Sequence, residues 1–173
     1  GSTPFSFNLH VEDVGHTLIF GPTGSGKSTL LALIAAQFRR YSGAQVFAFD
    51  KGRSMTALCL AARGAHYTLG EEGHAIAPLR AIDDLGLGWA QGWIEGLVTL
   101  ARQTVTPAMS REITAALQAC RTLDGEALAA FHAMVQDEDV KGAVAPYIEN
   151  GAYAGLLNGL KDEIAFSPFT VFE

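Results

Sequence analysis

One short segment carries most of the chemistry that this sequence suggests. Residues 21–28 read G-P-T-G-S-G-K-S, which fits the pattern G-x-x-x-x-G-K-[ST] at every fixed position. Such a loop wraps backbone N–H groups around the phosphates of a nucleotide, and its glycines let the chain approach closely. The lysine reaches the β- and γ-phosphates, and the serine hydroxyl binds Mg²⁺. We therefore predict a nucleotide site with Lys27 as its catalytic cation and Ser28 as a metal ligand.

The flanks of this loop support the same prediction. An apolar run at residues 16–20 predicts the strand that delivers the loop, and an amphipathic run at residues 29–40 predicts the helix that leaves it. A helix N-terminus adds its own free N–H groups to a phosphate site. The residues predicted to bind ATP are those of the loop and the start of this helix: Gly21, Pro22, Thr23, Gly24, Ser25, Gly26, Lys27, Ser28 and Thr29.

Asp50, which closes an apolar run, is a second candidate for the site. A carboxylate at the end of a buried strand can meet Mg²⁺ through water, hold a substrate hydroxyl as in small P-loop kinases, or bond the backbone of Gly52 or Arg53 in a turn. All three roles stay open at this point. Arg53 also has two open roles, since it can contact a phosphate of its own or a neighbouring subunit, or pair with Asp50 at the surface.

Hydrophobic periodicity predicts the α/β framework that positions these residues. Strands are expected at residues 5–11, 44–49 and 66–69, with helices at 29–40 and 55–62. This order predicts a parallel sheet with right-handed crossovers and a nucleotide at the carboxyl edge of the strands. The inner face of the first helix is predicted to consist of Leu30, Leu31, Leu33, Ile34 and Phe38.

From about Asp84 onward the pattern is helical. Four helices are expected, and Thr106-Pro107 reads as an N-cap followed by a first-turn proline. Asp137 marks the start of the last helix, which Pro146 interrupts or ends. The residues predicted to line the apolar seams are Trp89, Trp93, Leu97, Leu100, Ile113, Leu117, Cys120, Leu128, Phe131, Val135, Val140 and Val144.

These patterns divide the chain into three parts. Residues 1–83 are predicted to form the nucleotide-binding α/β portion, and residues 84–160 an all-helical subdomain. Residues 161–173 include the apolar run 169–172, which predicts a strand that returns to the sheet. A chain of 173 residues is long enough for one substantial core with a small appended subdomain.

Composition narrows the functional classes further. The net charge of −6 argues against a general nucleic-acid binder, which usually carries a basic stripe. The five histidines show no spacing typical of a metal site, and Cys59 and Cys120 are too far apart in sequence to suggest one. No apolar run approaches the ~18 residues of a membrane span.

Three stretches of the sequence together resemble one known family. They are residues 5–10, residues 16–28 and residues 46–54, the last of which reads V-F-A-F-D-K-G-R-S. They look like the ATPases of conjugal transfer and type IV secretion, the TrbE-type proteins related to the fourth VirB component and to CagE. Ala77-Pro78-Leu79 is similar to the Asn-Pro-Leu stretch of that family, with Ala77 in place of the asparagine.

The resemblance implies a RecA-like P-loop NTPase domain with an all-helical insertion, truncated before the strand that carries the acidic pair needed for hydrolysis. It implies a parent ATPase that binds ATP and Mg²⁺ and works as a homo-oligomer, such as a hexamer. Its expected place is the bacterial cytoplasm, peripheral at the inner membrane, with other secretion-channel components. This fragment is then expected to bind ATP but to be a poor catalyst alone, because hydrolysis needs a carboxylate that orients water.

Two alternatives to this motor fragment stay open. One is a small-molecule or nucleotide P-loop kinase, which needs an arginine-bearing lid over both phosphates. The later half offers Arg102, Arg111 and Arg121 for that purpose. The other is a partner-binding module that binds a nucleotide without turnover. Turnover with added phosphoryl acceptors separates the kinase from the other two.

Overall fold

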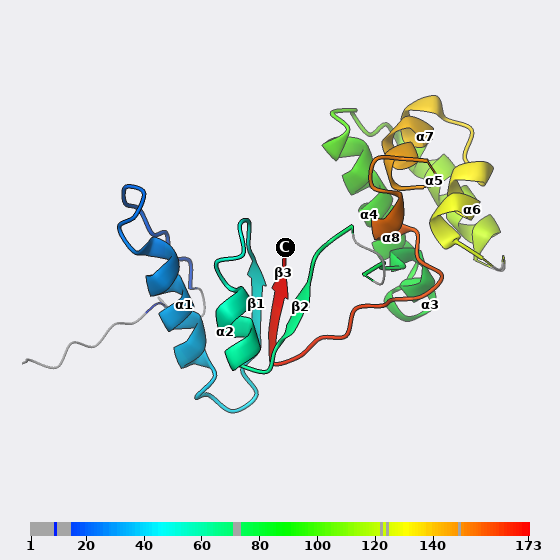
Figure 1. The fold of residues 1–173 in the computed structure, drawn as a ribbon. Helices are drawn as coiled ribbons and strands as arrows, with labels where there is room; N and C mark the ends of the chain where they lie inside the picture. The colour runs from blue at the N-terminus through cyan, green and yellow to red at the C-terminus, as the bar shows by residue number, and fades with distance from the viewer. Residues whose placement is uncertain (1–8, 10–14, 71–73, 122, 124, 149) are drawn as a thin grey trace, which may run out of the picture.

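The computed structural model describes residue 9 and residues 15–70, 74–121, 123, 125–148 and 150–173. Two parts are visible in Figure 1, an α/β part and a helical part. Two extended stretches, one entering and one leaving the helical part, connect it to the sheet (Figure 1). The strand predicted at residues 5–11 falls, except for Leu9, outside the described residues.

A three-stranded parallel sheet is the framework of the α/β part. Its strands are β1 (Val46–Phe49), β2 (Ala65–Tyr67) and β3 (Phe169–Phe172), in the order β1-β3-β2. β3 comes from the far end of the sequence and inserts between two strands that follow each other along the chain. All four of its residues are buried, so the predicted returning strand is confirmed and is the central strand of the sheet.

Two helices cover one face of this sheet. They are α1 (Lys27–Phe38) and α2 (Thr56–Ala61), and α1 contributes Ala32 and Ala35 to the core around Cys59 and Phe169. The predicted inner face of α1 is wrong, because its leucines Leu30, Leu31 and Leu33 are 47–57% exposed. Ala32 and Ala35 are small and only partly buried, and no residue of α1 is buried, so α1 packs loosely against this core. Leu31, Ile34 and Phe38 instead line an open groove beside Thr17 and Ile19.

The run that precedes the phosphate-binding loop is not a strand. Residues 15–20 have no regular structure, and Leu18 and Phe20 are 76% and 82% exposed. The predicted strand is therefore wrong for this structure. The physical reason is that a strand needs a neighbour to complete its ladder of hydrogen bonds. Within the described part of the chain, β1 pairs only with β3, and no strand pairs with this run.

The helical part is built around its own apolar core. Its longer helices are α4 (Leu87–Leu100), α5 (Pro107–Cys120), α6 (Ala127–Met134) and α7 (Glu138–Val144). Short elements complete it: the 3₁₀ turns η1 (Pro78–Ala81) and η2 (Ala145–Tyr147) and the short helices α3 (Ile82–Leu85) and α8 (Ala154–Leu157). The core already includes Leu79 and Ile82 of the short elements that precede α4. No helix within the described residues has both the length and the hydropathy needed to cross a membrane.

The predictions for this part succeed on α5 and only partly on α4, where Leu97 is buried and Trp93 packs against the core as predicted. The hydroxyl of Thr106 accepts a hydrogen bond from Met109 N at 3.2 Å, so the predicted N-cap is confirmed. In α4, however, Trp89 is 39% exposed and Leu100 75% exposed. The buried residues of α4 are instead Ala90, Ile94, Leu97 and Val98. Because α4 is apolar on more than one face, residue spacing alone cannot choose the face that packs.

Candidate functional site

The phosphate-binding loop has the backbone shape that its glycines predict. Gly24 and Gly26 lie in the left-handed region with φ of 81° and 85°, which favours glycine over other residues. At Gly21 the reason for glycine is space, because an added Cβ would lie 2.6 Å from Ser25 Oγ. Gly26 is the N-cap of α1, so the loop runs directly into the first turn of the helix.

Lys27 lies across this loop. Its Nζ donates hydrogen bonds to the backbone oxygens of Gly21 at 2.7 Å and Pro22 at 2.8 Å. These bonds keep the ammonium group over the loop, where the sequence pattern places a phosphate-binding cation. Ser28 follows it in the first turn of α1 and is exposed, so its hydroxyl can be reached by a metal ion bound at the loop.

The N-terminus of α1 suits an anion. Its N-cap residue makes no side-chain hydrogen bond to the first turn, and that turn contains no acidic residue. The unpaired N–H groups and the positive end of the helix dipole therefore have no competing anion from the helix itself. Together with Lys27 and the open loop, this helix end fits the phosphates of a nucleotide.

Asp50 is engaged in the turn that follows β1. Its Oδ1 accepts a hydrogen bond from Ser54 Oγ, and its Oδ2 accepts one from Met55 N, both at 2.8 Å. Burial raises the pKa of Asp50, but the hydrogen bonds from Met55 and Ser54 outweigh it and hold the pKa below its usual value. Of the three predicted roles, these contacts favour the turn residue. The partners are Ser54 and Met55 instead of Gly52 or Arg53.

Arg53 does not pair with Asp50, so that sequence prediction is wrong. Its Nε lies 3.4 Å from Oε2 of Glu173, the residue that follows β3. His66 of β2 also approaches the same oxygen, with Nε2 at 3.6 Å. Sequence reasoning missed this cluster because β3 enters the middle of the sheet from far along the chain. One signal in the sequence could have indicated this cluster: Glu173 directly follows an apolar strand, as Asp50 follows β1.

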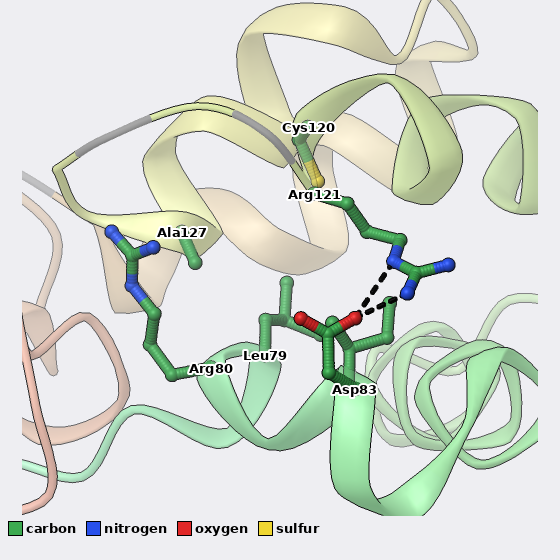
Figure 2. Close-up of a pocket in the computed structure, with 7 residues that line it drawn as sticks. Leu79, Arg80, Asp83, Cys120, Arg121 and Ala127 are labelled. Carbon is green, nitrogen blue, oxygen red and sulfur yellow. Dashed lines mark hydrogen bonds and ion pairs between the residues drawn. The ribbon is translucent and has the colours of Figure 1, made fainter.

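The helical part contains a separate small cavity (Figure 2). It measures about 50 Å³ and is lined by Leu79, Arg80, Ile82, Asp83, Cys120, Arg121 and Ala127. Figure 2 shows Arg121 directed toward Asp83, and Arg121 Nε donates to Asp83 Oδ1 at 3.0 Å. Arg80 reaches away from this pair to the backbone oxygens of Leu123 and Gly125. A cavity of this size holds a water molecule or two and cannot admit a nucleotide.

The metal chemistry of the described residues is limited. No group of three or more His, Cys, Asp or Glu side chains among them is arranged to hold a metal ion. Burial raises the pKa of both cysteine thiols, Cys59 and Cys120, which makes them poor nucleophiles and poor metal ligands. The phosphate-binding loop is therefore the candidate site that the geometry supports best.

Comparison with known proteins places this loop in a family. The family model described as ABC transporter matches residues 5–130. The chain is 50% identical over its full length to a probable conjugal transfer protein TrbE of Sinorhizobium fredii, and 48% identical to the conjugal transfer protein TrbE of Rhizobium radiobacter. The chain belongs to the TrbE/VirB4 family of P-loop proteins. The predicted resemblance is thus confirmed.

More distant TrbE/VirB4 relatives agree with this assignment. Protein virB4 of Agrobacterium fabrum is 28% identical over 97% of the chain. A solved structure, VirB4 of Thermoanaerobacter pseudethanolicus, superposes on 87% of the chain and 47% of its own length, with a TM-score of 0.64 at 15% identity. This likeness shows a common fold, the RecA-like α/β fold, in which helices flank a parallel sheet. The chain spans 27% and 22% of the two TrbE relatives.

Proposed function

We propose that this chain is the ATP-binding part of a motor ATPase that energises a bacterial conjugation or type IV secretion channel. The observation that supports it best is the loop of residues 21–26, which presents Lys27 and an uncapped helix N-terminus at one place. The similarity of the whole chain to part of two TrbE proteins supports the proposed connection of this nucleotide site to conjugal transfer.

Within this proposal, each site residue has a physical role. The backbone from Gly21 to Gly26 surrounds the phosphates, Lys27 exchanges its bonds to the loop carbonyls for phosphate oxygens, and Ser28 binds Mg²⁺. ATP supplies the phosphoanhydride bond whose hydrolysis drives the motor. Asp50 holds the start of α2, because both of its carboxylate oxygens accept hydrogen bonds there.

We further propose that the chain hydrolyses ATP slowly by itself. A phosphate cradle binds the ground state and the transition state alike, and such uniform binding does not raise the chemical rate. A carboxylate free to orient the attacking water would do so. The carboxylates that follow β1 and β3 are both engaged, Asp50 by the turn and Glu173 by Arg53. We propose that, in the parent protein, the hydrolytic groups are supplied from outside this chain or by an adjacent subunit.

We propose a cellular setting that is compatible with the names of the relatives, which refer to conjugal transfer and type IV secretion. The parent works as a homo-oligomer, such as a hexamer, beside other secretion-channel components. It lies in the bacterial cytoplasm, peripheral at the inner membrane. The helical subdomain, residues 84–160, is proposed to be an insertion into the nucleotide-binding fold, since its helices bury one another around their own core.

The first test is calorimetric titration with Mg-ATP. Lys27→Ala should weaken binding at least tenfold, roughly 1.4 kcal/mol or more, because it removes the cation that meets the phosphates. Lys161→Ala is the matched control, since Lys161 is an exposed lysine on the connection to β3. Equal ATP affinity in the wild type and in a folded Lys27→Ala variant would refute the nucleotide site.

A second measurement separates the proposal from its alternatives. Phosphate release by the wild-type chain should stay near background, and it should not increase when sugars, nucleosides or nucleoside monophosphates are added as acceptors. Transfer of the phosphoryl group to an acceptor would identify a kinase instead. Rapid, Lys27-dependent release of phosphate by this chain alone would show that it already holds a complete hydrolytic site.

A further inference from the structure

The carboxyl edge of the sheet contains a second polar cluster besides the phosphate-binding loop. The parallel register pairs Phe49 with Phe172 and Tyr67 with Phe172, so all three strands end together. The residues that follow β1 and β3 therefore lie at one edge, the edge where open α/β sheets bind their ligands. Figure 1 shows the phosphate-binding loop before α1 and the turn after β1 at the same end of the α/β part.

Glu173 is the half-buried centre of this cluster. Its side chain is only 15% exposed, and its Oε2 is fully buried and accepts no hydrogen bond within the described part of the chain. A buried carboxylate needs a cation close by, since removing an ion from water is costly. Arg53 Nε at 3.4 Å is the permanent cation nearby, and His66 Nε2 lies at 3.6 Å. His66 also contacts Thr56 Oγ1 at 3.3 Å.

Arg53 is held in an unusual conformation beside this carboxylate. Its φ of 60° lies in the left-handed region, which residues with a Cβ rarely adopt. The ion pair with Glu173 engages Nε, on the inner side of the guanidinium. Meanwhile the Arg53 side chain as a whole is 72% exposed. No hydrogen bond within the described residues engages its two terminal nitrogens, Nη1 and Nη2, and such a planar pair of donors can bind phosphate in a bidentate manner.

We propose that Arg53 binds a phosphate of the nucleotide and that Glu173 is the positioning residue that orients its guanidinium for this purpose. The inference rests on the proposed nucleotide-binding function. The phosphate belongs either to a nucleotide in the loop of the same chain or to one bound by a neighbouring copy. Both sources present the same chemistry, a dianionic phosphate at the carboxyl edge of the sheet.

The test compares Arg53→Ala with a matched control, Arg63→Ala. Arg63 is also exposed and also has a left-handed backbone, with φ of 54°, but it follows α2 instead of β1. If the phosphate is bound by the same chain, we expect Arg53→Ala to reduce the affinity for Mg-ATP about tenfold, while Arg63→Ala leaves it unchanged. Because Arg53→Ala also removes the ion pair with Glu173, the melting temperature of each variant is measured and affinities are compared where both are folded.

Glu173→Gln tests the positioning role. It keeps the shape of the side chain and removes the charge that holds Arg53 Nε. We expect the same loss of ATP affinity as in Arg53→Ala, and no additional loss in the double variant, because both changes remove one interaction. A changed NMR signal of the Arg53 Nε–H group should accompany it. If Glu173 merely stabilised the fold, the two losses would add.

Protein concentration separates the two sources of phosphate. If the phosphate belongs to the same chain, the loss appears in dilute protein. If it belongs to a neighbouring copy, dilute protein binds ATP normally and Arg53→Ala abolishes ATP-dependent self-association in sedimentation. Wild-type affinity and wild-type association in Arg53→Ala and Glu173→Gln, with binding still lost in Lys27→Ala, would overturn this inference alone. If Lys27→Ala bound ATP as tightly as the wild type, the proposed function would be overturned as well.

Discussion

The two parts of the molecule bury their apolar side chains to very different degrees. In the helical part, Ile94, Ile113, Leu117 and Phe131 are all fully buried. In the α/β part, α1 has no buried residue along its described length, and Phe49 of β1 is 81% exposed. The helices obtain their partners from nearby in the sequence, whereas a parallel sheet needs cover on both faces and strands from distant segments. The phosphate-binding loop thus lies on the part that buries fewer of its apolar side chains.

The face of the sheet opposite α1 and α2 also leaves apolar side chains uncovered. Its aromatic side chains pack on one another: Phe49 stacks on Phe172 at 5.2 Å between ring centroids, and Phe47 meets Phe166 edge-to-face at 5.4 Å. An open apolar groove runs over this face, opposite α1 and α2. Parallel sheets in folded domains have helices on both faces. The α/β part therefore leaves apolar surface exposed, whereas the helical part buries its own.

The largest expected effect comes from breaking the complete core. Leu117→Asp places a charge at a fully buried position of α5 and should destabilise the protein by about 3–5 kcal/mol. Leu100→Asp at the exposed end of α4 is the control and should change stability by less than about 0.5 kcal/mol. Urea unfolding measures both. Equal midpoints for the two variants would contradict the packing of α5.

Nucleotide binding should stabilise the α/β part selectively. At about 100 times its Kd, a ligand that binds only the folded state adds about 2.7 kcal/mol. Hydrogen exchange should therefore slow most in α1, where the loop joins the helix, and little in α5 of the helical part. The Lys27→Ala variant provides the control without binding. Uniform slowing in both parts would show that they unfold as one unit and would remove the contrast.

A smaller effect tests a single helix end in the helical part. Thr106→Ala removes the side-chain acceptor for Met109 N and should cost about 1 kcal/mol. The nearby exposed Thr104→Ala serves as its control. Chemical denaturation with a fixed slope gives the difference directly. No difference between the two alanine variants would mean that the cap contributes nothing to stability.

The smallest expected effect is a pH dependence at the turn after β1. The folded-state pKa of Asp50 is depressed below its ordinary value of 3.8. A depressed acid contributes stability that is full above the unfolded pKa and is lost as pH falls through the folded pKa. Acid should therefore loosen the start of α2 below about pH 4, and Asp50→Asn should remove that dependence. Hydrogen exchange at Met55 measures it, and an unchanged profile in Asp50→Asn would contradict the role of the Asp50 carboxylate as acceptor for Met55 N.

Local signals in the sequence predicted much of the fold correctly. The N-cap at Thr106, the buried face of α5 and the apolar strand at residues 169–172 all agree with the structure. Each depends on side chains a few residues apart, whose chemistry acts within one turn or one strand. The predictions that fail concern which face packs. Trp89 and Leu100 follow a helical spacing, yet α4 buries Ile94 and Val98 instead.

The sequence by itself determined the phosphate-binding loop, because glycines, a lysine and a serine at this spacing create the site through backbone geometry over a few residues. Only the tertiary structure decided the partners of Arg53 and Asp50. β3 is inserted between β1 and β2 from more than a hundred residues away, and it brings Glu173 to Arg53 and His66. Such a pairing depends on strand order, which the packing of the whole sheet selects and no local pattern of residues encodes.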